Sequence, residues 1–207
     1  MKLIDISRPI FTGMPVWPGD TPAQFDFAAT KSGGYSCNVG RLRVSMHTGT
    51  HVDAPYHFDD AGLKIDEIPV DLYVGPARVV DVRGRATITP EMFASLDLAA
   101  TPRVLLRSDA WTNLAEFPTT WPQYAPGLAT WLAERGVRLI GMDFPSVDHL
   151  TSKDLPIHHE FGRAGVFILE SLDLCGVEAG VYELIALPLR VRGADGCPVR
   201  AVLRARD

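Results

Sequence analysis

Short alternating or apolar runs recur along the chain and predict a structure built mainly from strands. The first, residues 2–7 (KLIDIS), alternates apolar and polar positions, and Pro9 ends it because proline cannot donate a hydrogen bond to a sheet. Residues 35–46 (YSCNVGRLRVSM) alternate with a period of two through Leu42, Val44 and Met46. Six further runs are rich in valine, isoleucine and leucine and predict strands at residues 77–82, 103–107, 137–144, 165–170, 181–191 and 199–205.

Helical signals are fewer and fall in two stretches. Thr89 as an N-cap and Pro90 at the first helical position predict a helix over residues 91–98 (EMFASLDL). Residues 127–136 (GLATWLAERG) predict a second helix that ends in an arginine and a C-terminal glycine. This helix leads directly into the strand at 137–144, a step typical of α/β layering, so the predicted class is a strand-rich α/β fold.

Length and composition narrow the organisation further. The 207 residues contain no repeat or long linker and predict one domain over residues 1–207. A net charge of −5, spread along the chain, favours neither nucleic acid nor membrane as a partner. Without a signal peptide or spanning segment, we expect a cytoplasmic protein. Cys37, Cys175 and Cys197 lack a C-x-x-C pair, so we expect reduced, partly buried thiols instead of a disulfide framework or thiolate zinc site.

Residues 45–58 (SMHTGTHVDAPYHF) concentrate side chains that can bind metal or transfer protons. His47, His51, Asp53 and His57 are separated by four, two and four residues, and in extended backbone such even separations place them on one face. A helix would also align the first two histidines. However, the glycine and threonine between them and the proline beyond favour an extended segment or a strand end.

Two imidazoles and a carboxylate that converge suit a divalent ion such as zinc, manganese or ferrous iron. Further donors are available from His149, His158 and His159, and from Glu170, a lone carboxylate at the end of an apolar strand. Such sets usually leave a coordination position for water, so we expect a catalytic metal that lowers the pKa of water to about 7. His57 lies furthest from the H-x-x-x-H-x-D core and is predicted to carry the proton between water and the leaving group.

Four stretches resemble a known family. Residues 47–58 resemble the H-x-G-T-H-x-D-x-P-x-H signature of the cyclase family of metal-dependent hydrolases. Residues 15–22 (PVWPGDTP), 151–160 (TSKDLPIHHE) and 165–174 (GVFILESLDL) resemble its bacterial kynurenine formamidase branch. The resemblance implies a homodimer of swivelling β/β/α fold with two Zn²⁺ per subunit, with Mn²⁺ or another divalent metal as an alternative. It also implies hydrolysis of N-formyl-L-kynurenine to L-kynurenine and formate in tryptophan degradation.

The resemblance further implies a role for each matching residue. Trp17, in a loop rich in proline and glycine, would face the aromatic ring of the substrate, although such an aromatic residue can also simply pack its loop. Of the pair His158 and His159, the family's spacing to the glutamate favours His158 as a metal ligand. His159 could instead contact a ligand residue without binding the metal itself. The implied metal ligands are His47 and His51 on one ion, His158 on the other, and Asp53 and Glu170 between the two, with His57 as the acid–base residue.

Two alternatives to this function stay open. One is a related amidohydrolase of the same family that acts on a cyclic amide such as isatin; the context of Trp17 favours the formamidase instead. The other is a non-enzymatic protein whose metal holds a small acid or stabilises the fold, which leaves His57 without a role. Serine hydrolase and nucleotide-dependent mechanisms are not expected, because the sequence has no G-x-S-x-G or G-x-x-x-x-G-K-[ST] motif.

Overall fold

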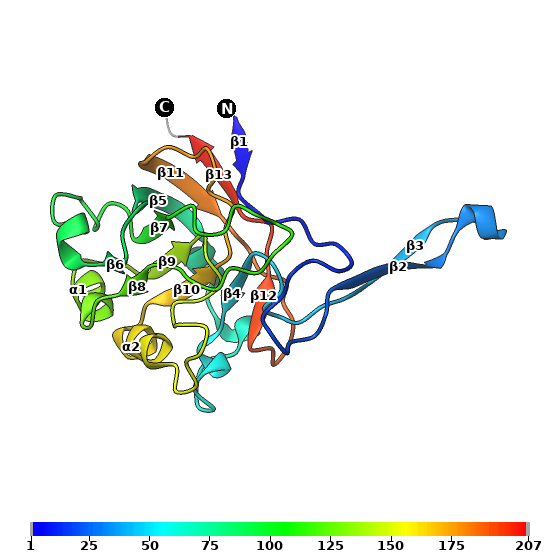
Figure 1. The fold of residues 1–207 in the computed structure, drawn as a ribbon, viewed down its shortest axis with the longest axis horizontal. Helices are drawn as coiled ribbons and strands as arrows, with labels where there is room; N and C mark the ends of the chain where they lie inside the picture. The colour runs from blue at the N-terminus through cyan, green and yellow to red at the C-terminus, as the bar shows by residue number, and fades with distance from the viewer. Residues whose placement is uncertain (1, 206–207) are drawn as a thin grey trace.

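Nine strands form one mixed sheet that organises the molecule (Figure 1). The computed structural model describes residues 2–205. The four neighbouring central strands run parallel to one another, and the pairings outside them are antiparallel. The predicted strand-rich α/β class is therefore confirmed. In order across the sheet the strands are β1 (Leu3–Asp5), β13 (Val202–Ala205), β11 (Gly180–Ile185), β5 (Val74–Asp81), β7 (Arg103–Arg107), β9 (Leu139–Met142), β10 (Phe167–Glu170), β4 (His51–Asp53) and β12 (Gly196–Pro198).

Apolar side chains cover both faces of the sheet. In β7, Leu105 packs into a cluster on one face, whereas Val104 and Leu106 pack into a second cluster on the other. Burial of each such leucine contributes about 1.5–3 kcal/mol. The helices α1 (Leu128–Ala133) and α2 (Pro156–Ala164) supply side chains to the second cluster, so both cover the same face. The remaining short elements of the body are β6 (Thr87–Ile88), β8 (Gln123–Tyr124) and the 3-10 helices η2 (Pro55–His57), η3 (Ile65–Glu67) and η4 (Val70–Tyr73).

The structure confirms the predicted strands, although it shortens several of them. The helix predicted over 127–136 is present as α1. The helix predicted over 91–98 is wrong, because the chain forms only the 3-10 helix η5 (Pro90–Phe93) there and the threonine before it makes no side-chain capping bond. Phe93 is buried in the core, and the N–H of Leu96 donates to its carbonyl oxygen, which closes a turn instead of extending a helix.

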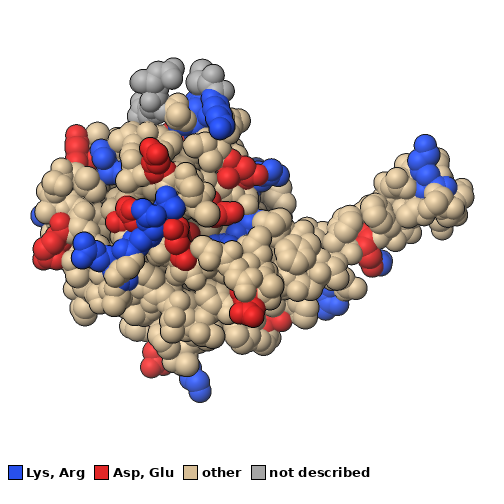
Figure 2. Space-filling view, turned by 45° about the horizontal axis from the view of Figure 1, so that its top comes forward, with Lys and Arg blue, Asp and Glu red and all other residues tan. Residues whose placement is uncertain are grey.

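A two-stranded hairpin, called the arm below, extends away from the sheet (Figure 1). It consists of β2 (Gln24–Ala29) and β3 (Val39–Arg43), joined through the 3-10 helix η1 (Lys31–Gly33). All residues of β3 are exposed in the single chain, so the alternation over residues 35–46 buries no face of this strand. In Figure 2 most of the arm surface carries no charge.

The cysteines only partly match expectation. Cys197 is buried, but Cys37 and Cys175 are exposed because they lie in turns at the surface. All three are free thiols. Within residues 2–205, no helix has both the length and the apolar character needed to cross a membrane.

Candidate metal centre and its cavity

The short strand β4 places two of the predicted ligands side by side. His51 and Asp53 point to the same face and are each only 2% exposed, while Val52 between them packs into the apolar core on the opposite side. The strand is paired with β10 on one edge and β12 on the other, so its backbone is held from both sides. The period-two prediction is confirmed for these two residues.

His47 and His57 reach the same place from outside the strand. His47 lies in a turn that Gly49 permits by adopting a φ of +65°, and His57 ends the 3-10 helix η2. The two imidazole rings lie 3.9 Å apart between centroids. The prediction that all four residues share one face of an extended segment is therefore wrong, because the glycine turn and the proline after Asp53 bend the chain at both ends of β4.

A first group of donor atoms consists of His47, His51 and Asp53. Nδ1 of His47 lies 3.0 Å from Oδ1 of Asp53, and Nε2 of His51 lies 3.3 Å from the same oxygen. Nδ1 of His51 lies 2.9 Å from the carbonyl oxygen of Gly49. Because that carbonyl can only accept, the neutral imidazole keeps its proton on Nδ1, and Nε2 is the nitrogen that loses its proton when a metal ion binds.

A second group shares Asp53 and adds His158 and Glu170. Nε2 of His158 lies 3.6 Å from Oδ2 of Asp53 and 3.7 Å from Oε1 of Glu170. Glu170 ends β10 directly opposite His51 of β4, and its Oε2 lies 3.5 Å from Nε2 of that histidine. The structure brings His158 into this group, whereas the ring of His159 lies against Phe58 at 5.7 Å.

Asp148 orients His158, a role that the sequence analysis missed. Its carboxylate accepts the backbone N–H groups of Ile157 and His158, each at 3.0 Å, which caps the first turn of α2. The same carboxylate lies 2.7 Å from Nδ1 of His158. The imidazole therefore donates Nδ1–H to Asp148 and turns Nε2 toward the carboxylates, the arrangement that metal-binding histidines usually adopt.

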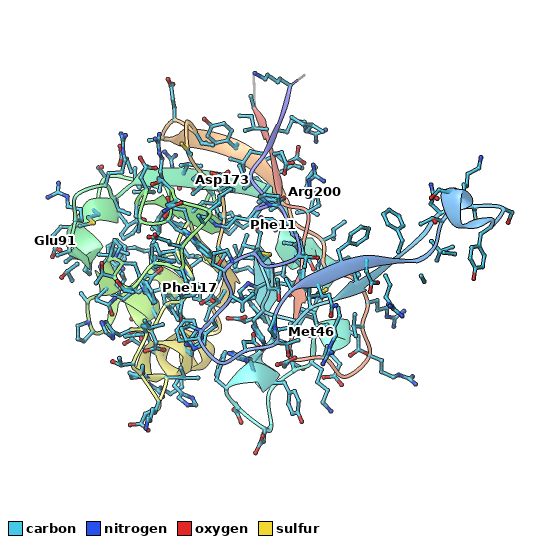
Figure 3. The ribbon with its side chains drawn as sticks, turned by 45° about the vertical axis from the view of Figure 1, so that its right-hand side comes forward. Phe11, Met46, Glu91, Phe117, Asp173 and Arg200 are labelled. Carbon is cyan, nitrogen blue, oxygen red and sulfur yellow. The ribbon has the colours of Figure 1, made fainter. Side chains whose placement is uncertain are left out.

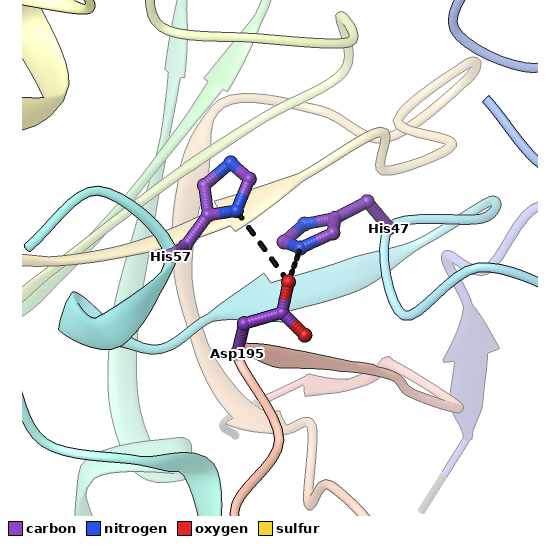
Figure 4. A group of neighbouring side chains, drawn as sticks. All are labelled: His47, His57 and Asp195. Atoms are coloured by element: carbon purple, nitrogen blue, oxygen red, sulfur yellow. Dashed lines mark hydrogen bonds and ion pairs between the residues drawn. The ribbon is translucent and has the colours of Figure 1, made fainter. Parts of the chain in front are cut away.

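Asp195 was also missed, and it connects two histidines on the outer side of the first group (Figure 4). Its Oδ2 lies 3.0 Å from Nε2 of His47 and 3.7 Å from Nδ1 of His57. The residue precedes β12, whose Gly196 is paired with Asp53 of β4. No sequence signal marks Asp195, because it approaches the histidines only through the pairing of β12 with β4.

The donor atoms fit a divalent metal ion. Nε2 of His51 and Oδ2 of Asp53 are buried, and neither has a hydrogen-bond partner among the described residues. An unsatisfied buried polar atom costs about 1–3 kcal/mol, so a fold that keeps two of them adjacent requires compensation. Imidazole nitrogen and carboxylate oxygen are the ligand types that zinc and similar divalent ions accept. We conclude that the two groups are built to hold divalent metal.

The two shared carboxylates differ in their electrostatics. Burial opposes ionisation of Asp53, but the adjacent imidazoles of His158, His47 and His51 hold its pKa well below the usual value. Burial and the neighbouring charge of Asp53 raise the pKa of Glu170. The metal-free site thus keeps one carboxylate firmly ionised, and the second ionises more readily when positive charge is present.

The histidines divide into two classes in the metal-free protein. Burial opposes protonation of His47, His51 and His158, but their carboxylate partners outweigh it and raise their pKa values to about 9, 10 and 10 respectively. Burial lowers the pKa of His57 to about 4, assisted by the charges of His47 and His158. His57 is therefore neutral at pH 7 and able to accept a proton, whereas the other three exchange a proton for a metal ion.

The ligands lie at the buried end of a cavity of about 480 Å³, within the range of small-molecule sites. Its walls include Trp17, Trp111 and Phe117. Trp17 packs edge-on against Phe117 at 5.8 Å and also contacts Trp121 at 6.2 Å, so it both anchors its loop and lines the cavity of its own chain. Phe117, labelled in Figure 3, and Trp111 come from the segment between β7 and β8, where the sequence analysis saw no site residue.

A mixed sheet that holds buried histidines and carboxylates at the end of a cavity defines a metal-dependent hydrolase. The sequence profile of the family described as "Putative cyclase" matches residues 4–149, and the chain belongs to this family. It is 49% identical to a kynurenine formamidase of Geobacillus thermodenitrificans over 97% of this chain and 96% of that protein. It is 46% identical, with the same coverage, to a kynurenine formamidase of Bacillus cereus.

Solved structures confirm the family fold. A potential metal-dependent hydrolase with cyclase activity superimposes with a TM-score of 0.84 at 30% identity, covering 100% of this chain and 98% of that one. An isatin hydrolase bound to the product analogue thioisatinate superimposes with a TM-score of 0.82 at 19% identity, covering 100% and 93%. The second likeness concerns the fold alone. The expected swivelling β/β/α architecture is thereby confirmed.

Proposed function

We propose that this protein hydrolyses N-formyl-L-kynurenine to L-kynurenine and formate, a step of tryptophan degradation. The observation that carries the proposal is the pair of donor groups with unpartnered atoms at the end of an aromatic cavity. The near full-length similarity to kynurenine formamidases supports this substrate. The cyclic-amide alternative rests on a likeness in fold alone, and nothing in the site favours it.

The ligand sets support two zinc ions per subunit. His47 and His51 would hold one ion and His158 the other, with Asp53 and Glu170 between them, because each carboxylate presents oxygen atoms toward both histidine groups. Bound metal would supply Lewis acidity toward the formyl oxygen and lower the pKa of water. Manganese is a weaker candidate because three imidazole donors suit zinc better.

His57 is the residue that moves the proton. Its Nδ1 faces Asp195, which leaves Nε2 to accept a proton from the attacking water. As the new carbon–oxygen bond forms and the carbon–nitrogen bond of the formamide breaks, Nε2 returns this proton to the aniline nitrogen. One water is consumed, and formate, a free amine and one proton are released, the proton being the second one of the attacking water. In the metal-free protein, burial lowers the pKa of this imidazole to about 4, so that it is in the accepting form at neutral pH before metal binds.

The aromatic walls position the ring of the substrate. Trp17 borders the same cavity as His57, and its orientation is fixed by edge-on contacts with Phe117 and Trp121. A ring held rigidly in this way offers a surface for the aniline ring without a further loss of side-chain entropy. Trp17 therefore serves the substrate while it packs its loop.

We also propose that the protein is a homodimer in which the arm lies against a second copy. Phe25, Phe27 and Leu42 on the arm are 46%, 54% and 52% exposed, and each strand of the arm pairs only with the other among the described residues. An isolated two-stranded hairpin is marginally stable in water, so these side chains need a covering surface. Figure 3 labels Phe11 and Met46 near the base of the arm, and of these Phe11 is exposed, so apolar surface continues from the arm onto the body.

Light scattering tests the dimer. Phe27→Asp is expected to yield a monomer with unchanged helix and sheet content, while Asp26→Ala, which removes an exposed ion pair with Arg41, should leave the dimer intact. A wild-type protein that is monomeric at micromolar concentration would refute the proposal.

The decisive test of the function is release of kynurenine from N-formyl-L-kynurenine by the purified protein. Turnover should be present in the zinc-loaded protein, vanish after chelation and return when zinc is restored. If the protein retains bound zinc but does not turn over this substrate, the proposal is wrong, and hydrolysis of isatin should then be measured in the same preparation.

A further inference from the structure

N-formyl-L-kynurenine has a formamide on an aromatic ring at one end and a zwitterionic α-amino acid at the other. The proposed function assigns the formamide to the metal centre and the ring to the aromatic walls. It leaves the carboxylate and the ammonium group of the amino acid without partners. The charged side chains that line the cavity beyond the metal ligands are therefore of interest, and this step rests on the proposed function.

Lys153 is the only lysine or arginine among the described residues that line the cavity. It is exposed, whereas His51, His158 and Glu170 of the same cavity are buried, so it lies toward the open end. No acidic group of the described chain lies within ion-pair distance of its ammonium group, so this charge is free to meet a ligand. A cation without a partner at the mouth of a binding cavity is suited to an anionic group of the ligand.

The backbone around Lys153 is well defined. The N–H of Ser152 donates to the carbonyl oxygen of His149 at 2.8 Å. Leu155 adopts a left-handed conformation with φ of 44°, and the next residue begins α2, which carries the ligand His158. Lys153 is thus five residues before a metal ligand, on a segment that is fixed at both ends. Its position relative to the metal centre is set by the fold.

Asp20 provides the opposite charge and is adjacent to the aromatic wall. Its N–H donates to the carbonyl oxygen of Trp17 at 2.9 Å, so the ring and the carboxylate belong to one turn. Its Oδ1 accepts the N–H of Thr21 at 2.6 Å, and no basic side chain among residues 2–205 forms an ion pair with it. The other acids of the cavity, Glu170 and Asp195, are occupied by histidines.

We infer that Lys153 binds the α-carboxylate of the substrate and that Asp20 binds its α-ammonium group. The cavity then matches the substrate in three parts: metal-binding side chains for the formamide, aromatic walls for the ring, and two lining residues of opposite charge for the amino acid. Both residues are specificity determinants that touch the substrate away from the reacting atoms.

The carboxylate contact is tested by changing the enzyme and the substrate together. The ratio of kcat/KM for N-formyl-L-kynurenine to kcat/KM for its methyl ester should fall about tenfold in Lys153→Ala, because the ester has lost the charge that Lys153 recognises. The loss should appear mainly in KM, since the contact is the same in the ground state and the transition state. Lys153→Arg should restore most of the ratio, and Lys2→Ala, at an exposed lysine outside the cavity, should keep the wild-type ratio.

The contact between Asp20 and the ammonium group is tested with a second pair of substrates. Asp20→Asn should lower the preference for N-formyl-L-kynurenine over the analogue that lacks the α-amino group, again about tenfold. The asparagine keeps the acceptor for Thr21 and therefore the turn, so a loss of folding is not expected.

The outcomes separate this inference from the proposed function. If the wild-type zinc protein hydrolyses none of these formamides, the proposed function fails. If it hydrolyses them all and neither variant changes its ratio, the function stands and the assignment of Lys153 and Asp20 is wrong. If only one ratio changes, the assignment of the other residue is overturned.

Discussion

Removal of the Asp148 carboxylate should weaken both the helix that carries His158 and the metal site itself. In Asp148→Ala, the N–H groups of Ile157 and His158 lose their acceptor, and loss of such an N-cap costs about 0.5–2 kcal/mol. The buried hydrogen bond to Nδ1 of His158 is charge-assisted, and its loss costs about 1.5–3 kcal/mol. We therefore expect metal-free Asp148→Ala to be about 2–5 kcal/mol less stable than wild type.

The effect of Asp148→Ala on metal affinity can be measured separately from its effect on folding stability. Loss of a carboxylate that orients a ligating histidine lowers metal affinity about 10–100-fold. Competition with a chromophoric chelator at pH 7 measures this affinity under conditions where the variant is still folded, and urea unfolding of the metal-free protein measures the stability. Asp154→Ala is the matched control, because Asp154 lies in the same segment, is exposed and caps nothing. Wild-type zinc affinity in a folded Asp148→Ala protein would refute the assigned role.

Three further predictions concern the same centre. Glu170→Ala should lose metal and turnover together, whereas His57→Ala should retain metal and lose rate; equal metal loss in both, measured by elemental analysis, would contradict the division of roles. Gly196→Ala would place a Cβ 2.9 Å from Cε1 of His47, so zinc affinity should fall and stability should decrease by about 1–3 kcal/mol, as calorimetry would detect. In the metal-free protein, His51 and His158 have pKa values raised from 6.5 to about 10, so their protonated rings stabilise the fold fully below pH 6.5 and lose this effect as pH rises through 10. Urea unfolding across this range should show that the free energy of unfolding declines as pH rises. Zinc affinity should rise over the same range, because the histidines must lose a proton to bind metal.

The sequence predicted the side chains of the candidate metal centre better than the residues that support them, for a physical reason. His51 and Asp53 are two residues apart on one strand, so local periodicity alone places them together, and Glu170 is conspicuous as a charge at the end of an apolar run. Asp195 and Asp148 act through a strand pairing and a helix cap that exist only once the chain is folded. Residues such as Asp195 and Asp148 stand at no characteristic distance in the sequence from the histidines they support, so a pattern search does not find them.

The helix α2 illustrates the same limit. Its sequence, PIHHEFGRA, places two histidines and a glycine where a helix would usually carry better helix formers, so its local propensity is weak although Ile157, Phe161 and Ala164 share one apolar face. Phe161 anchors it in the core and Asp148 caps it, so tertiary contacts outweigh its weak local propensity. The arm shows the converse, because its alternation predicts a strand correctly but does not reveal that the strand leaves the body.

Backbone strain borders the metal centre on both sides. Leu155 and Ser171 have φ values of 44° and 57°, which cost a non-glycine residue about 1–2 kcal/mol each. Leu155 lies three residues before the ligand His158, and Ser171 directly follows the ligand Glu170. The N–H of Ser171 donates to Phe144, and its carbonyl oxygen accepts the hydroxyl of Thr50, so the core holds the strained conformation in place. The fold therefore gives up stability at the two turns that border the segments carrying His158 and Glu170, which bring Nε2 of His158 within 3.7 Å of Oε1 of Glu170 and both side chains beside Asp53.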